Sequence, residues 1–261
     1  PGGKINTLID PSGYAYECIP SNRIKGVTAT IYYKDADGKE IMWNADDYGQ
    51  LNPQITDAAG WFAWDVPEGL WQVRFTAEGY EDYATEWLPV LPVQLNDDGL
   101  DVEELAKVLR EHNPKFIYVI PNFQNPTGLT YSEETRIKVA ELLKKTDVMV
   151  LEDNPYGELR FTGKAGHSFH YFLGEQCCLL GTFSKIVAPG MRLGWIACKV
   201  PEIREKLLAY KSTMDLHTNI FCQMVLEQFL QDNDLDAHIE KTRVMYKQKA
   251  EFMMKINKWP S

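Results

Sequence analysis

Strands and helices alternate along the chain from about residue 93 onward, and this alternation is the feature that most restricts its fold. Four apolar runs have the length and composition of buried strands: PKFIYVI, DVMVLED, CCLLGTF and RLGWIACK. Helical patterns separate or follow them: VEELAKVLREH, EETRIKVAELLKKT, PEIREKLLAY and the stretches 218–231 and 235–257. Such interleaving predicts an α/β domain with a mostly parallel, doubly wound sheet. We expect the run PKFIYVI to be buried on both faces of that sheet.

Two of the predicted helices carry capping signals at their starts. Asp101 precedes VEELAKVLREH, and Glu104 stands three residues later, which predicts a capping box. Ser132 precedes EETRIKVAELLKKT and is expected to start that helix. Side chains of this kind accept hydrogen bonds from backbone N–H groups that the first helical turn leaves unpaired. Asp101 and Ser132 therefore indicate where these two helices begin.

Residues 1–92 differ in character from the rest of the chain. They hold 6 Lys and Arg against 14 Asp and Glu, a net charge of −8 out of −10 for the whole chain, and five of its seven tryptophans. Short runs rich in Val, Ile, Tyr, Thr and Trp recur between turn clusters, without helical periodicity. This spacing predicts an antiparallel β-sandwich over residues 1–92, separate from the α/β domain over residues 93–261. The sequences KDADGKE and VPEG are expected to be the turns of two hairpins.

Charge, hydropathy and cysteine usage exclude several classes of function. The net charge of −10 argues against a nucleic-acid or anionic-membrane surface. No apolar run reaches the roughly 18 to 20 residues of a membrane span, and the first residues lack the pattern of a signal peptide. The five cysteines form no CxxC and have no histidine at metal-ligand spacing, so we expect no metal site. Four are expected to be reduced and buried, which favours a cytoplasmic location for the second part: Cys177, Cys178, Cys198 and Cys222.

Polar side chains with complementary chemistry stand at the carboxyl ends of three predicted strands. Asn125 follows FIYVI in PNFQNPTG, Asp153 ends VMVLED, and Lys185 follows CLLGTF. Ligands of parallel sheets bind at that edge, so we expect the three side chains to share one pocket. A lysine amine forms a Schiff base with an aldehyde, and the aldehyde cofactor pyridoxal phosphate also needs a carboxylate at its ring nitrogen. Hydroxyls and a cation that suit its phosphate surround the lysine in sequence: Thr182, Ser184 and Arg192.

Three motifs give residues 93–261 a resemblance to the large domain of fold-type I, class I/II aminotransferases. They are NPTG at 125–128, DNPY at 153–156 and SKIVAPGMRLG at 184–194. The resemblance is strongest to the branch of 2-aminoadipate and aromatic aminotransferases and MocR-type regulators. It implies amino transfer from an amino acid to a 2-oxo acid, with pyridoxal 5′-phosphate as cofactor and a homodimer as the assembly.

The same resemblance implies a role for each site residue. Lys185 would form the Schiff base and shuttle the substrate proton, and Asp153 would pair with the ring nitrogen. Asn125 and Tyr156 would bind the phenolic oxygen of the cofactor. The phosphate would be held by the remaining three residues: Thr182, Ser184 and Arg192. The catalytic set is therefore expected to be Lys185, Asp153 and Tyr156.

The chain departs from the family pattern at both ends of this region. The segment before Leu100 should hold a helix start that cups the phosphate and an aromatic residue that stacks on the cofactor, but it reads as β-structure. The small domain that carries the arginine for the substrate carboxylate does not follow before Ser261. We therefore expect a truncated core that is weakly active or inactive, unless a partner chain supplies the missing parts. A chimeric chain joined near WLPVLPVQLNDDG is an alternative.

The first part carries a second resemblance. The stretch TDAAGWFAWDVPEGLWQVRFTAEGY resembles carboxypeptidase regulatory-like modules, which are transthyretin-like or immunoglobulin-like sandwiches often found along bacterial cell-surface proteins. The resemblance covers about residues 10–92 and implies a fold without implying chemistry. It leaves two other functions open: a non-catalytic cell-surface or binding protein whose β-sandwich is the functional module, and a regulatory protein that holds the cofactor without turnover.

Overall fold

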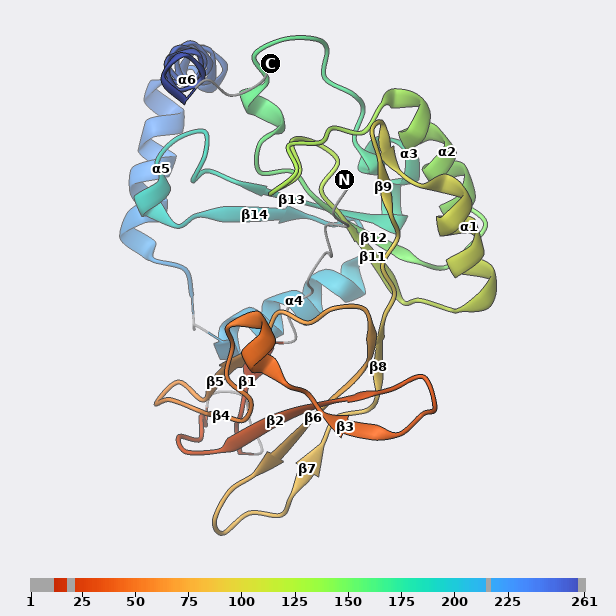
Figure 1. Cartoon of the computed structure of the whole chain (residues 1–261). Coiled ribbons are helices and arrows are strands. Elements are labelled where there is room, and N and C mark those ends of the chain that lie inside the picture. Colours follow the sequence, from red (N-terminus) through yellow and green to blue (C-terminus); the bar gives the residue numbers. More distant parts are fainter. Residues whose placement is uncertain (1–11, 18–21, 215–216, 258–261) are drawn as a thin grey trace. The chain divides into compact units, whose positions relative to one another are not determined.

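The computed structural model describes residues 12–17, 22–214 and 217–257 (Figure 1). Backbone contacts divide the chain into two compact units, residues 1–92 and residues 93–261. Each unit has its own hydrophobic core. The first unit is built mainly of strands, and the second combines strands with helices.

The first unit contains an antiparallel sheet whose central strands are β2 (Thr28–Lys34) and β6 (Gly69–Thr76). Four more strands pair directly with one of these two: β3 (Glu40–Met42), β4 (Gln54–Ile55), β7 (Tyr83–Ala84) and β8 (Leu88–Val90). A separate antiparallel pair is formed by β1 (Ser12–Tyr14) and β5 (Trp61–Ala63). A 3₁₀ turn, η1 (Ala45–Tyr48), follows β3. Three tryptophans, Trp43, Trp64 and Trp71, are buried in the core of this unit.

One of the two hairpins predicted here forms. β2 and β3 pair across the KDADGKE turn, where Asp35 Oδ1 accepts from the N–H groups of Asp37 and Lys39 at 3.0 and 2.9 Å. The hairpin predicted around VPEG is wrong, because β5 pairs with β1 and β6 pairs with β2. The side-chain amide of Gln50 bonds to the backbone of Asp65, and that of Gln54 bonds to the backbone of Ala63. These bonds occupy the edge of β5 that a hairpin with β6 would need.

The second unit is an α/β structure around a four-stranded sheet in the order β11–β12–β13–β14. The strands are β11 (Phe116–Val119), β12 (Met149–Asp153), β13 (Cys177–Thr182) and β14 (Gly194–Ala197). The first three are parallel, with Val119 opposite Glu152 and Asp153 opposite Leu180. β14 is antiparallel to β13. The prediction of an α/β unit with a mostly parallel sheet is therefore confirmed.

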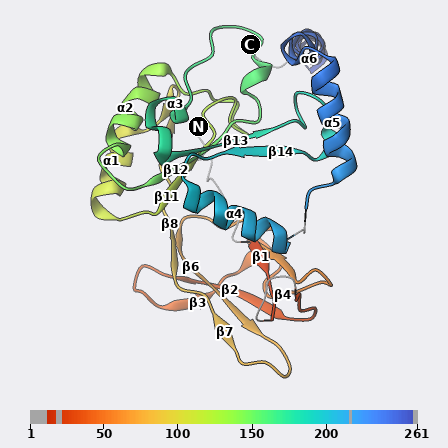
Figure 2. The same cartoon turned by 180° about the vertical axis from the view of Figure 1, so that it is seen from behind.

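Three helices gather on one side of this sheet in both views (Figures 1 and 2). They are α1 (Val102–Glu111), α2 (Glu133–Leu143) and α3 (Phe169–Leu173). Their apolar residues enclose the core with the sheet, as Leu105, Val139 and Phe169 are buried against Val119 and Val150. A short ladder of β9 (Leu95–Asn96) and β10 (Gly99–Leu100) precedes α1.

The other three helices bury little of their surface. They are α4 (Pro201–Met214), α5 (Ile220–Asp232) and α6 (Leu235–Asn257), and Leu226 and Ile239 are the buried apolar residues of α5 and α6. Figures 1 and 2 show α5 and α6 beyond β14. Three 3₁₀ turns complete the unit: η2 (Gly157–Leu159), η3 (Gly174–Gln176) and η4 (Pro189–Met191). Within the described part of the chain, no helix combines the length and apolar character that a bilayer crossing requires.

Both predicted helix caps form, although the capping box does not. Asp101 Oδ1 accepts from the N–H groups of Glu103 and Glu104 at 3.0 and 2.9 Å, and Ser132 Oγ accepts from Thr135 N–H at 3.1 Å. The Glu104 carboxylate does not reach back to Asp101 N–H. It accepts from the N–H of residue 94 at 2.5 Å, while Asp101 N–H donates to the carbonyl oxygen of the same residue.

The expectation that PKFIYVI is buried on both faces is wrong. In β11, Val119 is buried on the side of α1 to α3, whereas Phe116 and Tyr118 are 58% and 51% exposed. Successive side chains of a strand point to opposite faces, so Phe116 and Tyr118 share the second face. The described residues leave that face open at β11, which makes it accessible to a ligand.

Candidate functional site

Asp153 is the last residue of β12 and lies at the carboxyl edge of the sheet. It shares the open face with Leu151, which is opposite Tyr118 in the register of β11 and β12. The phenol of Tyr118 donates a hydrogen bond from Oη to Asp153 Oδ2 at 2.6 Å. An O–H group and a carboxylate at this distance form a charge-assisted hydrogen bond. The sequence did not single out Tyr118, although it is the direct partner of the predicted carboxylate.

The electrostatic environment keeps Tyr118 in its protonated, hydrogen-donating form. Burial raises the pKa of the Tyr118 phenol, and the hydrogen bond to Asp153 and the charge of that carboxylate raise it further. Tyr156 adds to the same upward shift, which places its phenol within electrostatic range of Tyr118. Asp153, Tyr118 and Tyr156 therefore form one group at the end of β12.

The amine of Lys185 lies beside this group. Its Nζ is 5.7 Å from the centroid of the Tyr156 ring, a distance typical of a cation–π contact. Lys185 is exposed in the loop after β13, and Tyr156 immediately precedes η2 after β12. Among the described residues, no hydrogen bond or ion pair engages the Lys185 amine. Two of the predicted catalytic residues, Lys185 and Tyr156, are thus neighbours across the ends of two parallel strands.

The residues predicted to hold a phosphate have different surroundings. The Thr182 hydroxyl donates to the Leu193 carbonyl oxygen at 3.2 Å and accepts from Ser184 N–H at 3.1 Å, so its proton is engaged within the loop. Ser184 is 8% exposed. Arg192 is exposed and has a left-handed backbone conformation with φ +54°. Ser184 and Arg192 retain the hydroxyl and the guanidinium group that a phosphate needs, while Thr182 shapes the loop that presents them.

Asn125 lies at the tip of a loop that connects β11 to α2. The loop is closed by hydrogen bonds from Gln124 N–H to the Leu129 carbonyl oxygen and from Gly128 N–H back to the Gln124 carbonyl oxygen, at 2.8 and 2.6 Å. The peptide bond between Asn125 and Pro126 is cis. Asn125 is exposed, and no hydrogen bond joins it to Asp153, Tyr156 or Lys185 within the described residues.

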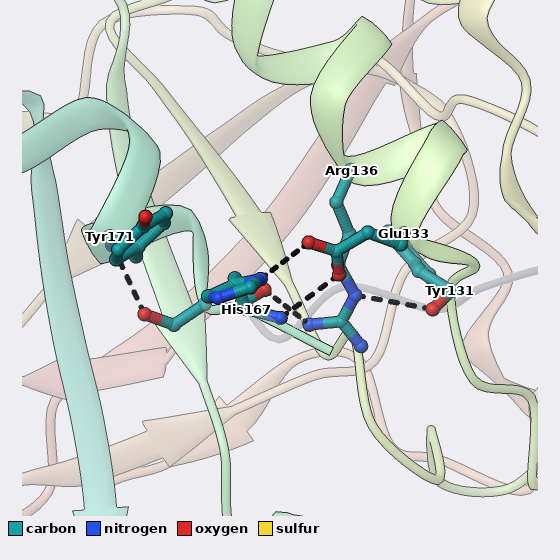
Figure 3. A network of polar contacts seen from close by, with 6 residues as sticks. Tyr131, Glu133, Arg136, His167 and Tyr171 are labelled. Carbon is teal, nitrogen blue, oxygen red and sulfur yellow. Dashed lines mark hydrogen bonds and ion pairs between the residues drawn. The ribbon is translucent and has the colours of Figure 1, made fainter. Parts of the chain in front are cut away.

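A buried cation, Arg136 of α2, fixes both ends of this loop, and Figure 3 shows its contact with Tyr131 at one of them. Its Nε donates to the Tyr131 carbonyl oxygen at 3.1 Å, and its Nη2 donates to the Pro121 carbonyl oxygen at 2.8 Å. Nη2 also donates to Asn122 Oδ1 at 2.9 Å, and Nη1 donates to the His167 carbonyl oxygen at 3.0 Å. Burial lowers the pKa of Arg136, and the four acceptors compensate part of the cost of burying its charge.

The Arg136 network continues on both sides. Toward the surface, the Glu133 carboxylate accepts from His167 N–H at 3.0 Å and contacts His167 Nδ1 at 2.5 Å (Figure 3), and the side-chain hydrogen bond to His167 lowers the pKa of Glu133. Toward the site, Asn122 Nδ2 donates to Asn154 Oδ1 at 2.9 Å, and Asn154 Oδ1 also accepts from Gly157 N–H at 3.2 Å. Arg136 is thereby connected to the residue that follows Asp153.

A cavity of about 310 Å³ opens beside Lys185. Its lining includes Ser184 and Lys185 from the loop after β13, and Lys241 and Tyr246 from α6. Asn125 and Asp153 are not among its lining residues. That Asn125, Asp153 and Lys185 share one pocket therefore stays a prediction.

The described cysteines are free thiols outside the site. Cys177, Cys178 and Cys198 are buried as expected, and Cys222 is only partly buried. Burial raises the pKa of both Cys177 and Cys178 to about 12, so neither is a thiolate nucleophile at neutral pH. Cys18 lies outside the described residues.

Comparison with known proteins identifies related chains. The profile of the family described as "Aminotransferase class I and II" matches residues 78–257, so the match starts earlier than the predicted residue 93. Aromatic-amino-acid aminotransferase 1 of Thermococcus litoralis is 38% identical over 184 residues, which cover 68% of this chain and 43% of the relative. The chain thus spans less than half the length of this relative.

Solved structures of aminotransferases also resemble part of this chain. A kynurenine aminotransferase from Pyrococcus horikoshii, in complex with PMP, is 37% identical with a TM-score of 0.59. An α-aminoadipate aminotransferase from Thermus thermophilus, complexed with N-(5′-phosphopyridoxyl)-L-leucine, is 32% identical with a TM-score of 0.59. Each match covers 62% of this chain and 42% of the solved chain.

Proposed function

This chain belongs to the aminotransferase class I and II family, and we propose that its second unit is the part of an aminotransferase that binds pyridoxal 5′-phosphate. The observation that carries the proposal is the group at the ends of β12 and β13. There the Asp153 carboxylate is held by Tyr118 at 2.6 Å, and the Lys185 amine lies 5.7 Å from the Tyr156 ring. The substrates we propose are an α-amino acid and a 2-oxo acid. The relatives named for aromatic amino acids, kynurenine and α-aminoadipate do not select one of these for this chain.

The donors present fit the chemistry of the cofactor. Lys185 offers an amine to its aldehyde, and Asp153 offers a carboxylate to its protonated ring nitrogen. Tyr156 and Asn125 carry a phenol and an amide that can bind its phenolic oxygen. Ser184 and Arg192, the buried hydroxyl and exposed guanidinium of one loop, suit its phosphate, and Thr182 holds that loop through Leu193 and Ser184.

When bound, pyridoxal 5′-phosphate supplies a covalent attachment point for amines and a ring that takes up electrons from the substrate. The Asp153 carboxylate would accept a hydrogen bond from the ring N–H and so keep that proton in place. Lys185 Nζ would act as the general base that takes the proton from the substrate α-carbon and delivers it to the C4′ carbon of the cofactor. Tyr156 lies beside Lys185 and orients the amine for this transfer.

We further propose that the chain by itself binds the cofactor weakly. Lys185 and Arg192 are exposed, and exposed charges in water contribute little binding free energy; the neutral Asn125 amide is exposed as well. The Thr182 proton is engaged in the loop and is not offered to a phosphate. Several powers of ten in affinity depend on charge-assisted hydrogen bonds to the phosphate, each worth about 1.5–3 kcal/mol.

Titration of the purified chain with pyridoxal 5′-phosphate, followed by borohydride reduction and peptide mass spectrometry, tests this function. We expect the pyridoxyl group on Lys185, and we expect Lys185→Met to abolish the absorbance change. Lys199→Met is the matched control, because Lys199 is exposed like Lys185 but lies at the opposite end of the antiparallel pair β13 and β14. Equal labelling of Lys185 and Lys199 would refute the proposed site. A low-micromolar complex that turns over faster than the free cofactor would refute weak binding by the chain alone.

For the first unit we propose the carboxypeptidase regulatory-like sandwich, without a catalytic side chain. Its antiparallel strand pairing and its separate tryptophan-rich core support this assignment. The family match extends over residues 78–92 of this unit, where β7 and β8 pair with β6. Those two strands therefore belong to the sheet of the first unit in the fold, whatever their origin.

A further inference from the structure

Tyr118 is the residue near the site for which neither the motifs nor the comparisons give a role. It stands in the middle of an apolar strand, yet its side chain is 51% exposed on the open face of the sheet. Its neighbours on that face are Leu151, directly opposite in the register, and Asp153. A tyrosine that only fills space does not need a carboxylate partner, but Tyr118 Oη donates to Asp153 Oδ2 at 2.6 Å.

The hydrogen bond makes the two carboxylate oxygens of Asp153 different from each other. Oδ2 is occupied by the phenol, and Oδ1 has no hydrogen-bond partner among the described residues. An aspartate at the end of a strand can otherwise rotate its carboxylate about two side-chain bonds. A donor fixed to the neighbouring strand removes that freedom, because β11 and β12 are joined along their whole register.

We propose that Tyr118 is a positioning residue: its phenol holds the Asp153 carboxylate in one orientation, with Oδ1 presented to the ring nitrogen of the cofactor. This inference rests on the proposed function. Burial and the Asp153 carboxylate raise the pKa of the Tyr118 phenol, so the phenol keeps its proton at neutral pH.

The proposal is tested in the full chain by comparing two ligands. The first is pyridoxal 5′-phosphate, and the second is its analogue in which carbon replaces the ring nitrogen. Tyr118→Phe removes only the phenolic oxygen and leaves the ring. We expect this variant to bind pyridoxal 5′-phosphate about tenfold more weakly and to bind the carbon analogue unchanged. Tyr171→Phe is the matched control, because Tyr171 is exposed on α3 and its hydroxyl makes no hydrogen bond within the described residues; it should bind both ligands like the parent chain.

A double-mutant cycle separates positioning from a structural role. If Tyr118 acts through Asp153, Tyr118→Phe should have no further effect on affinity in the Asp153→Asn background. A tenfold loss that persists in that background, or that extends to the carbon analogue, would overturn the proposal. Failure of the parent chain to bind pyridoxal 5′-phosphate through Lys185 would overturn the proposed function and this inference with it. Normal binding by the parent and by Tyr118→Phe alike would overturn this inference alone.

Discussion

Replacement of the buried Arg136 by methionine tests the best-defined polar network of the second unit. Methionine keeps most of the volume and the unbranched stem, so it isolates the loss of the guanidinium group. Arg136 is fully buried, and its four hydrogen bonds end on groups that bracket the Asn125 loop and on the His167 carbonyl oxygen. The variant should therefore lower the free energy of unfolding and loosen that loop.

The size of the loss in the free energy of unfolding depends on which of the four acceptors keep a second hydrogen-bond donor in the variant. The Pro121 carbonyl oxygen also accepts from Tyr131 N–H at 2.9 Å, and Asn122 Oδ1 also accepts from Arg160 Nη2 at 3.3 Å. The carbonyl oxygens of Tyr131 and His167 have no other donor among the described residues. A buried acceptor left without a donor costs about 1–3 kcal/mol, which applies to the Tyr131 carbonyl oxygen, whereas the His167 carbonyl oxygen is only partly buried and can bind water instead. With the lost cation beside Glu152, we expect a total cost of about 2–4 kcal/mol. A domain stable by about 5–15 kcal/mol would lose a large part of its stability.

Urea denaturation followed by far-UV circular dichroism measures this loss. Lys138→Met is the matched control, since Lys138 lies on the same helix, is exposed and pairs with Glu134 at 2.7 Å. An exposed pair of this kind contributes less than about 1 kcal/mol, so the control should stay close to the parent. A loss below about 1 kcal/mol for Arg136→Met, with an unchanged slope against urea, would refute the account of Arg136 as the anchor of the loop.

Two further substitutions test the interiors of the two units. Burial raises the pKa of the Glu152 carboxyl, so the folded chain binds the carboxyl proton more tightly than the unfolded chain does. The free energy of unfolding therefore falls as the pH rises from the ordinary pKa of 4.5 through the raised pKa. Denaturation of Glu152→Gln should therefore show a gain over the parent at neutral pH that disappears below pH 4.5, and a gain independent of pH would contradict this reading. In the first unit, Thr56 Oγ1 accepts from Val27 N–H and donates to the Ile24 carbonyl oxygen, both at 2.9 Å. Thr56→Val should cost about 1–3 kcal/mol in a tryptophan-fluorescence melt, whereas the exposed Thr76→Val should not, and equal shifts would count against it.

The fold of the second unit was predictable because its signals are local. Periodicity gave the strands and helices, and Asp101 and Ser132 cap the helices as expected. The exposure of Phe116 and Tyr118 was not predictable, because an apolar run reads alike whether one or both faces are covered. The VPEG hairpin failed for a similar reason: the side chains of Gln50 and Gln54 occupy the edge of β5, and no local pattern announces a bond across such a distance.

The candidate site was predictable at positions where a reactive residue type is unusual for its sequence context. A lone lysine and a carboxylate at strand ends stand out, so the sequence alone singles out Lys185 and Asp153 as candidates. Tyr118 and Arg136 were missed because their types are ordinary in their contexts. A tyrosine in an apolar strand predicts packing, and an arginine in an amphipathic helix predicts a solvated face. The β11–β12 register is needed to see that Tyr118 bonds to Asp153. The orientation of α2 is needed to see that Arg136 is buried and bonds to the loop.

Different contacts fix the Asp153 side and the Lys185 side of the candidate site, so different substitutions should disturb each side. Asp153 stands on a central strand, where the β11–β12 register and the Tyr118 phenol fix its carboxylate. Lys185 stands on a loop, where the Thr182 hydroxyl ties the backbone of residues 184 and 193 together. Disturbance of the sheet should therefore alter the pairing with the ring nitrogen, while disturbance of the loop should alter the attachment of the amine. Because these supports share no residue, we expect substitutions in the sheet and in the loop to change affinity for the cofactor ring and reactivity of the lysine separately.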